Sequence, residues 1–340
     1  MEPNTEPNME PHISSSDNTL YPDDSQLPTL VPSSGVLSDI VIKHLVICGG
    51  GIAGLIAYSI LRESNKSGIW DIEKLKSIYG TSAGAIIAVI IALKYDWVEI
   101  DDYIIKRPWE HVFKFDIGSV IHSFDSRGIL GKKIIEEIIC PLLKGKDLEN
   151  NTTMKELYEY SKIDIHIFTT EIHNYETVDI SHKTHPDWKV IDAIYCSACL
   201  PIIFMPYLKD GNCYADGGIT NNYPIYQCLD NGANPDEIFG ITLPKENNKQ
   251  TISEQSSLFD YLSLILNRMY KHAYLASIKD REYKIRYELL LENAIESMYD
   301  FMNVSSSKEQ RSLLLNKGSE LWNVFMEKHI IEAQCLFTGP

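Results

Sequence analysis

The sequence is poor in positive charge. It holds 31 Lys and Arg against 47 Asp and Glu, which gives a formal net charge of −16 at pH 7. Nucleic acids are bound by clustered basic side chains, so we expect this chain to bind no nucleic acid. The same deficit excludes electrostatic attachment to anionic membranes, and any contact with lipid must come from local apolar surface.

Long apolar stretches are missing as well. The most apolar segment, Ala83–Leu93, is far shorter than the roughly 20 residues that cross a bilayer. It predicts a buried helix, and no transmembrane segment is expected. The N-terminus opens with Glu, Pro and Asn instead of the basic and then apolar run of a secretory leader. We therefore expect a cytoplasmic protein, with or without peripheral contact to membranes.

The cysteines form no recognisable disulfide framework. There are seven, an odd number without regular spacing, which is typical of a reducing compartment. Cys196 and Cys199 have the spacing of a metal-binding or redox pair, but no second pair at zinc-site spacing accompanies them. A structural role is predicted for both, and the chain is expected to need no metal and no cofactor.

Composition divides the chain into three parts. Residues 1–40 contain seven acidic residues and no Lys or Arg, and a segment this polar is predicted to be disordered. Residues 41–245 alternate between strand-like and helix-like segments, which predicts an α/β domain of three layers with a predominantly parallel sheet. Residues 246–340 are predicted to form a helical C-terminal extension, because apolar residues recur on one helix face at Leu258, Leu262, Ile265, Leu266 and Met269.

Individual elements can be predicted within the α/β part. Strands are expected at 44–48, 77–79, 163–172, 177–181 and 213–215, with a last buried strand at 237–243. Helices are expected at 52–62, 83–93, 131–139 and 189–197.

A serine flanked by small residues lies between a predicted strand and the apolar helix. The segment reads Gly80-Thr81-Ser82-Ala83-Gly84, and small neighbours permit the strained turn of a nucleophile elbow, which exposes the serine hydroxyl above a sheet. The helix N-terminus behind Ser82 favours negative charge that develops during attack. A run of small residues can also simply begin a helix, so the role of Ser82 depends on partners elsewhere in the chain.

Three consecutive glycines follow the first predicted strand. The N–H groups of Gly49, Gly50 and Gly51 can converge on an oxyanion, because no Cβ stands in the way. Together with Gly54 they also fit the GxGxxG fingerprint of a dinucleotide-binding oxidoreductase. That alternative requires a strand ending in an acid about 20 residues further on, and the polar segment 70–74 provides none.

Asp216 ends another short predicted strand and is followed by Gly217 and Gly218. The glycines let another backbone approach closely. Asp-Gly-Gly alone is a common turn. With Ser82 and the glycine loop, however, Asp216 completes the nucleophile, base and oxyanion cradle that acyl transfer requires.

A Ser-His-Asp triad is disfavoured. Only His272 and His329 follow Asp216, and both lie in the predicted helical tail. The separation of 28 positions between Gly54 and Ser82 is also too short for the strands that an ordinary α/β-hydrolase has at this point. We therefore predict a dyad of Ser82 and Asp216.

Four blocks of the sequence resemble the patatin-like phospholipase family, over roughly residues 44–244. They are GGGIAG from Gly49, GTSAGAIIAVIIAL from Gly80, CSACLPIIFMPY from Cys196 and DGGITNNYP from Asp216. The resemblance implies a three-layer α/β/α fold and calcium-independent hydrolysis of glycerolipid or phospholipid acyl esters, met at a membrane or micelle surface.

The same resemblance implies roles for individual residues. Ser82 would be the nucleophile, Asp216 the proton acceptor and Gly49–Gly51 the oxyanion loop. The other glycines of the motifs would support the backbone: Gly54, Gly80, Gly84, Gly217 and Gly218. Asn222 and Pro224 would shape the turn after the aspartate.

One position departs from the family pattern. Ala53 stands where many members have Arg or Lys, and the lost charge would weaken the binding of phosphate-bearing substrates. Three functional classes remain open: a lipid acyl hydrolase, a catalytically weak lipid- or protein-binding relative of the family, and a dinucleotide-binding oxidoreductase. The first is favoured because it alone uses all three motifs as catalytic parts.

Overall fold

A computed structural model describes residues 41–113, 125–244, 282–291 and 298–337, together with most of 251–269. Residues 1–40, predicted from composition to be disordered, lie outside the described residues. Within the described part of the chain, no helix combines the length and the apolar character needed to cross a bilayer.

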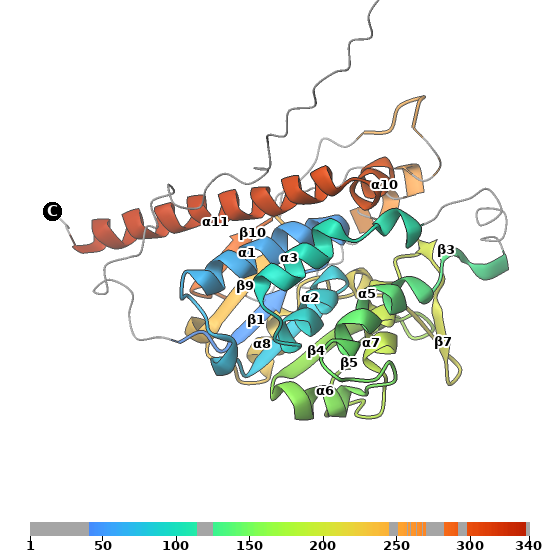
Figure 1. The fold of residues 1–340 in the computed structure, drawn as a ribbon, viewed down its shortest axis with the longest axis horizontal. Helices are drawn as coiled ribbons and strands as arrows, with labels where there is room; N and C mark the ends of the chain where they lie inside the picture. Colours follow the sequence, from blue (N-terminus) through green and yellow to red (C-terminus); the bar gives the residue numbers. More distant parts are fainter. Residues whose placement is uncertain are drawn as a thin grey trace, which may run out of the picture. The chain divides into compact units, whose positions relative to one another are not determined.

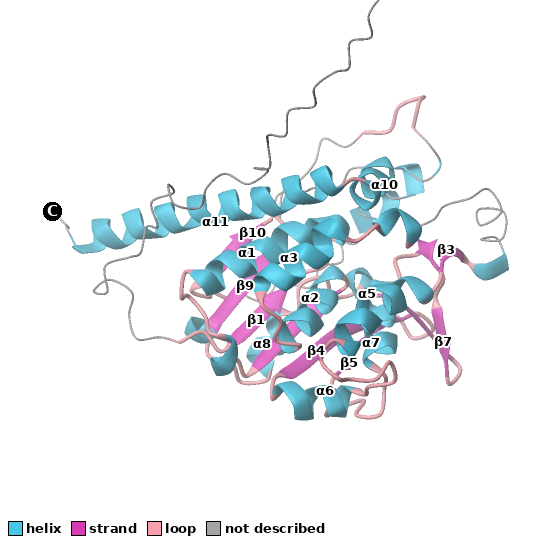
Figure 2. Cartoon of the chain, in the orientation of Figure 1, coloured by secondary structure: helices cyan, strands magenta, loops and turns pink. Residues whose placement is uncertain are grey.

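A mixed eight-stranded sheet lies at the centre of the fold (Figure 1, Figure 2). Its order is β10-β9-β1-β2-β4-β8-β7, and β5 pairs with β4. The strands are β1 (His44–Ile47), β2 (Ser77–Thr81), β4 (Asp164–Glu171), β5 (Glu176–Ile180), β7 (Tyr207–Lys209), β8 (Asn212–Asp216), β9 (Ile238–Thr242) and β10 (Tyr287–Leu290). From β10 to β4 all neighbours are parallel, whereas β5 and β8 run antiparallel to β4. The predicted α/β class with a predominantly parallel sheet is confirmed.

The central strands are buried along their whole length. All five residues of β2 and of β9 are buried, as expected of parallel strands that helices cover on both faces. At the margin of the sheet, β7 is partly exposed. The continuous apolar runs that predicted these strands therefore reflect their position in the middle of the sheet.

Helices cover both faces of the sheet. They are α1 (Gly54–Lys66), α2 (Ala83–Ala92), α3 (Trp97–Lys106), α5 (Lys133–Lys144), α6 (Met154–Ser161), α7 (Val190–Ala198), α8 (Ile225–Asp230), α10 (Met298–Ser306) and α11 (Lys308–Phe337). The Thr169 hydroxyl donates to the Cys196 carbonyl in α7, whereas Asn231, just after α8, donates to the Tyr79 hydroxyl. Tyr79 lies beside His166 in the β2–β4 register, so Tyr79 and Thr169 point to opposite faces. Helices α7 and α8 therefore lie on opposite sides, and the three layers are present.

Two short strands form a separate small sheet that the sequence did not predict. β3 (Gly128–Leu130) pairs in parallel with β6 (Ile202–Phe204). A small apolar cluster of Ile129, Leu130 and Ile134 lies beside this pair.

The prediction that the chain is helical beyond residue 245 is wrong at 287–290. There β10 joins the edge of the main sheet, in parallel with β9, so the strand predicted at 237–243 is not the last one. The segment is too short to show a period of its own, and its pairing with β9 determines its conformation. On the helical face predicted further upstream, Leu258 and Met269 are exposed.

Helix α11 runs beside α1 (Figure 1). A Cβ at Gly318 would lie 2.5 Å from the Ser59 Cβ, so the two helices approach each other as closely as a glycine allows. The Ser59 hydroxyl donates to the Leu315 carbonyl (2.5 Å), and the Trp322 indole N–H donates to the Ser67 hydroxyl (3.1 Å). The C-terminal helix is thus packed against the layer that covers the sheet.

Candidate active site

Ser82 forms a strained turn between β2 and α2. Its backbone has φ 53° and ψ −118°, a conformation that a residue with a Cβ adopts only where the surroundings enforce it. The neighbouring glycines permit the turn, because a Cβ at Gly80 would lie 2.5 Å from the Gly84 carbonyl oxygen. Ser82 is partly exposed, so a substrate can reach it.

Asp216 lies at the end of β8, opposite Thr169 of β4 in the antiparallel register. Its carboxylate is buried and accepts a hydrogen bond from the Gly218 N–H (2.7 Å). Burial raises the pKa of Asp216 to about 6, although the Ser82 hydroxyl and the Gly218 N–H act in the opposite direction. At neutral pH the carboxylate is therefore mostly ionised, yet far more ready to accept a proton than an ordinary aspartate.

The glycine loop after β1 lies against Ser82, since a Cβ at Gly49 would be 3.0 Å from the Ser82 Cβ. Gly49 and Asn222 exchange two hydrogen bonds. The Gly49 N–H donates to the Asn222 carbonyl (3.1 Å), and the Asn222 side-chain amide donates to the Gly49 carbonyl (3.2 Å). The sequence predicted that the Gly49 N–H faces an oxyanion, but this N–H is already hydrogen-bonded to the Asn222 carbonyl.

The next two glycines are better situated to bind an oxyanion. Gly49 is buried, but Gly50 is partly exposed and Gly51 is exposed. Gly51 has φ 54°, a conformation that glycine adopts without strain. Over the described residues, neither Gly50 nor Gly51 donates its N–H to a backbone carbonyl outside the helical turn that follows. Two of the three predicted donors are therefore available.

Two further glycines bring the Asp216 turn close to the sheet. A Cβ at Gly217 would lie 2.9 Å from the Thr81 methyl group and closer still to the Phe168 carbonyl, and one at Gly218 would lie 2.8 Å from the Asn222 side-chain oxygen. Gly54 brings the starts of α1 and α2 together in the same way, because its Cβ would lie 2.8 Å from that of Ala83.

Ala53 is buried, with 2% of its surface exposed. The sequence-based interpretation held that a basic side chain at this position would meet a lipid phosphate. A buried position inside the glycine loop does not fit that interpretation, because a basic side chain would first have to displace its neighbours.

Sequence reasoning missed Ser197 of α7. Its hydroxyl accepts the backbone N–H of Ser82 (2.8 Å). The flanking cysteines, Cys196 and Cys199, are buried free thiols whose pKa burial raises well above the ordinary value, as fits the structural role predicted for them. The one available signal was the position of Ser197 inside the third block of the family resemblance.

Of the two histidines considered for a triad, the structure describes His329 alone, and its ring contacts do not include Ser82 or Asp216. His329 lies on α11, where its ring packs against Phe325 and Tyr287. His272 lies outside the described residues.

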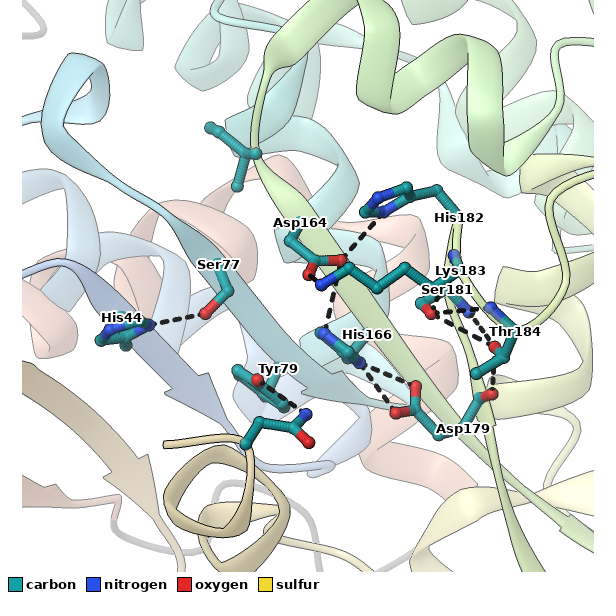
Figure 3. A network of polar contacts seen from close by, with 12 residues as sticks. His44, Ser77, Tyr79, Asp164, His166, Asp179, Ser181, His182, Lys183 and Thr184 are labelled. Atoms are coloured by element: carbon teal, nitrogen blue, oxygen red, sulfur yellow. Dashed lines mark hydrogen bonds and ion pairs between the residues drawn. The ribbon is translucent and has the colours of Figure 1, made fainter. Parts of the chain in front are cut away.

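A second polar cluster surrounds the start of β4 (Figure 3). His166 lies between two carboxylates, with Nδ1 2.8 Å from Asp179 and Nε2 3.4 Å from Asp164. His182 and Lys183 also contact Asp164, at 2.9 and 2.5 Å. Among the described residues, no three His, Cys, Asp or Glu are arranged to hold a metal ion.

Comparison with known proteins relates the chain to one family. The family model described as patatin-like phospholipase matches residues 45–229. The chain is 27% identical to the uncharacterised protein R571 of Acanthamoeba polyphaga mimivirus, over 72% of this chain and 82% of that protein. It is 26% identical to the "Probable lipid hydrolase 463L" of Invertebrate iridescent virus 6, over 66% and 77% of the two chains.

Among solved structures, VipD from Legionella pneumophila aligns with a TM-score of 0.43 and 16% identity, over 82% of this chain and 67% of VipD. ExoU from Pseudomonas aeruginosa, in complex with SpcU, aligns with a TM-score of 0.37 and 14% identity, over 68% of this chain and 50% of that chain.

Proposed function

This chain belongs to the patatin-like phospholipase family, and we propose that it is a lipid acyl hydrolase in which Ser82 attacks an acyl ester with Asp216 as its base. The substrate we propose is a glycerolipid or phospholipid met at a membrane or micelle surface. One relative carries a name that states lipid hydrolysis. The observation that carries the proposal is the strained, partly exposed Ser82, whose hydroxyl lies near enough to the buried Asp216 carboxylate to lower its pKa.

In the first half of the proposed reaction, the Ser82 oxygen bonds to the acyl carbonyl carbon while its proton passes to Asp216. The carbonyl oxygen becomes an oxyanion, and the N–H groups of Gly50 and Gly51 are its proposed donors. The positive end of α2, which begins directly after Ser82, favours the same charge. The bond to the alcohol then breaks, and the leaving oxygen takes the proton from Asp216.

In the second half, water attacks the acyl–Ser82 ester. Asp216 accepts a proton from the water and returns it to the serine oxygen as the fatty acid leaves. A carboxylate with a pKa of about 6 suits both directions, because it accepts a proton during attack and gives it up again during release.

The surroundings of Gly49 argue against a dinucleotide-binding function. In that class the pyrophosphate approaches the glycine backbone closely. Here Asn222 and Ser82 occupy the space around Gly49, and the Gly49 N–H is bonded to a carbonyl.

Three proteins test the proposal: wild type, Ser82→Ala and Asp216→Asn. We expect wild type to react with a fluorophosphonate probe and to hydrolyse phospholipid in mixed micelles, also in the presence of excess EDTA. Ser82→Ala should do neither, and Asp216→Asn should lose nearly all turnover, because an amide cannot accept the serine proton.

Ser181→Ala is the matched control, since Ser181 is a buried serine outside the site and its loss should leave the rate unchanged. Turnover by Ser82→Ala at the wild-type rate would refute the proposed nucleophile. Purified protein that is yellow or binds a dinucleotide would favour the oxidoreductase class instead. Protein that binds phospholipid without hydrolysing it would favour the catalytically weak relative.

A further inference from the structure

The hydroxyl of Ser197 connects the Ser82 turn to the central sheet. It accepts the Ser82 N–H (2.8 Å) and donates to the Phe168 carbonyl in β4 (2.5 Å). Ser197 is fully buried and its bond to Phe168 is shielded from water. The Ser82 N–H is the first backbone donor after β2 and belongs to no helix turn, which leaves Ser197 to satisfy it.

The same part of α7 also holds the Asp216 side of the site. The Asp216 N–H donates to the Cys199 carbonyl (3.1 Å). The Thr169 hydroxyl lies within hydrogen-bond distance of the Cys196 and Ala215 carbonyls, at 2.9 and 2.8 Å. The end of α7 is therefore bonded to both partners of the proposed dyad, through Ser197 to the serine and through Cys199 to the aspartate.

We propose that Ser197 is a positioning residue, whose buried hydroxyl holds the Ser82 backbone in its strained conformation at a fixed distance from Asp216. This inference rests on the proposed function. Without the hydroxyl, the Ser82 N–H loses its partner, and the turn can relax to remove that penalty. The nucleophile then moves relative to both the base and the oxyanion donors, while Ser197 itself, being fully buried, adds nothing to the exposed surface that meets substrate.

The test compares kcat and KM for wild type, Ser197→Ala and Ser197→Thr, together with the rate at which a fluorophosphonate probe labels Ser82. A displacement of about 1 Å at a reacting centre costs about 100-fold in rate. We expect Ser197→Ala to lose about 10- to 100-fold in kcat and in labelling rate, with KM within about twofold of wild type. Ser197→Thr retains the hydroxyl and should recover kcat to within about fivefold.

Ser64 provides the matched control. It is equally buried, and its hydroxyl likewise makes two hydrogen bonds, to the Leu61 carbonyl (3.0 Å) and from the Trp70 indole (2.8 Å). Ser64→Ala should lower the melting temperature by an amount similar to Ser197→Ala and leave kcat unchanged. If Ser197→Ala does not fold, Ser197→Cys and Ser64→Cys allow the same comparison, because a thiol is a much weaker acceptor.

A Ser197→Ala kcat within threefold of wild type would overturn the proposal, as would an equal loss of kcat in Ser64→Ala. The proposed function fails separately. Wild type that is labelled at Ser82 but hydrolyses no ester contradicts the hydrolase, and the relative labelling rates then decide about Ser197. Wild type that neither reacts with the probe nor turns over contradicts both.

Discussion

The imidazole of His166 lies flat against the ring of Tyr79, with 4.4 Å between the centroids and 2° between the planes. Burial alone would lower the pKa of this histidine. The hydrogen bonds and charges of Asp164 and Asp179 outweigh burial and raise the His166 pKa to about 9. The ring is therefore a cation at neutral pH, held between two carboxylates inside the sheet layer (Figure 3).

This pKa predicts a loss of stability on the alkaline side. Between the unfolded value of 6.5 and about 9, the folded state holds a proton that the unfolded chain has released. The stabilisation is therefore complete below pH 6.5 and is lost as the pH rises through 9. In urea denaturation, the free energy of unfolding of wild type should fall by up to about 3 kcal/mol more than that of His166→Gln between these two pH values. If the free energies of unfolding of the two proteins change in parallel with pH, the prediction is contradicted. His173→Gln, at an exposed histidine, is the control.

Removal of the Asp216 charge should abolish activity but raise the free energy of unfolding at neutral pH. Its folded pKa of about 6 lies above the ordinary 3.8, so the stability that its bound proton provides is present below pH 3.8 and is lost as the pH rises through 6. Asp216→Asn should be inactive but up to about 3 kcal/mol more stable than wild type at pH 7. The difference should disappear near pH 4, and a variant less stable than wild type at pH 7 would contradict this.

The rate should follow the same ionisation. Because the proposed base must be unprotonated, wild-type kcat/KM should fall about tenfold per pH unit below an apparent pKa near 6. A profile that stays flat down to pH 4.5 would show that no group of this pKa limits the reaction.

Asn222 joins the glycine loop to the turn after Asp216. Asn222→Ala removes the side-chain bond to the Gly49 carbonyl but keeps the backbone bond, so we expect kcat to fall by roughly 10-fold with a small stability loss of about 1 kcal/mol. Asn222→Asp should lower kcat and stability further than Asn222→Ala, because a carboxylate would face the Gly49 carbonyl oxygen. Steady-state rates and thermal melts of the two variants check this ranking. A kcat for Asn222→Asp equal to or above that of Asn222→Ala would contradict it.

The burial of Ala53 predicts what a basic residue does there. Ala53→Arg must place a charged side chain at a position that is 2% exposed, so we expect a lower melting temperature and no gain in activity on phospholipid relative to neutral ester. Matched kcat/KM values for the two substrates provide the measurement. A selective gain on phospholipid would restore the interpretation that position 53 governs headgroup charge.

Gly318 sets the approach of α11 to α1. Gly318→Ala improves helix propensity by about 1 kcal/mol, but the added methyl would lie 2.6 Å from the Ile56 carbonyl oxygen. We therefore expect a net loss of about 1–3 kcal/mol. Asn316→Ala, at an exposed position of the same helix, should be neutral or stabilising. Equal stability for wild type and Gly318→Ala would mean that the helices can move apart without cost.

Local signals in the sequence predicted the parts of the fold that local physics determines. The turn at Ser82 follows from small residues between an apolar strand and an apolar helix, and β8 was found from three residues before Asp216. By contrast, β10 has four residues and exists because β9 offers it an edge. The contact between Ser82 and Ser197 joins residues 115 positions apart, and no local pattern in the sequence encodes it. The bond from Gly49 to Asn222 was hidden for the same reason.

The pairing of α1 with α11 has a consequence for how the protein is made. Ser59 and its partner Leu315 are 256 residues apart, and chains are synthesised at roughly 5–20 residues per second. The face of α1 that α11 covers is therefore bare for roughly 13–50 s during translation. A ribosome that stops near residue 229, where the family match ends, has made Ser82 and Asp216 but not the helix that covers α1. The covering of α1 therefore has to wait until α11 has been synthesised, and a product that terminates before α11 leaves this face of α1 exposed.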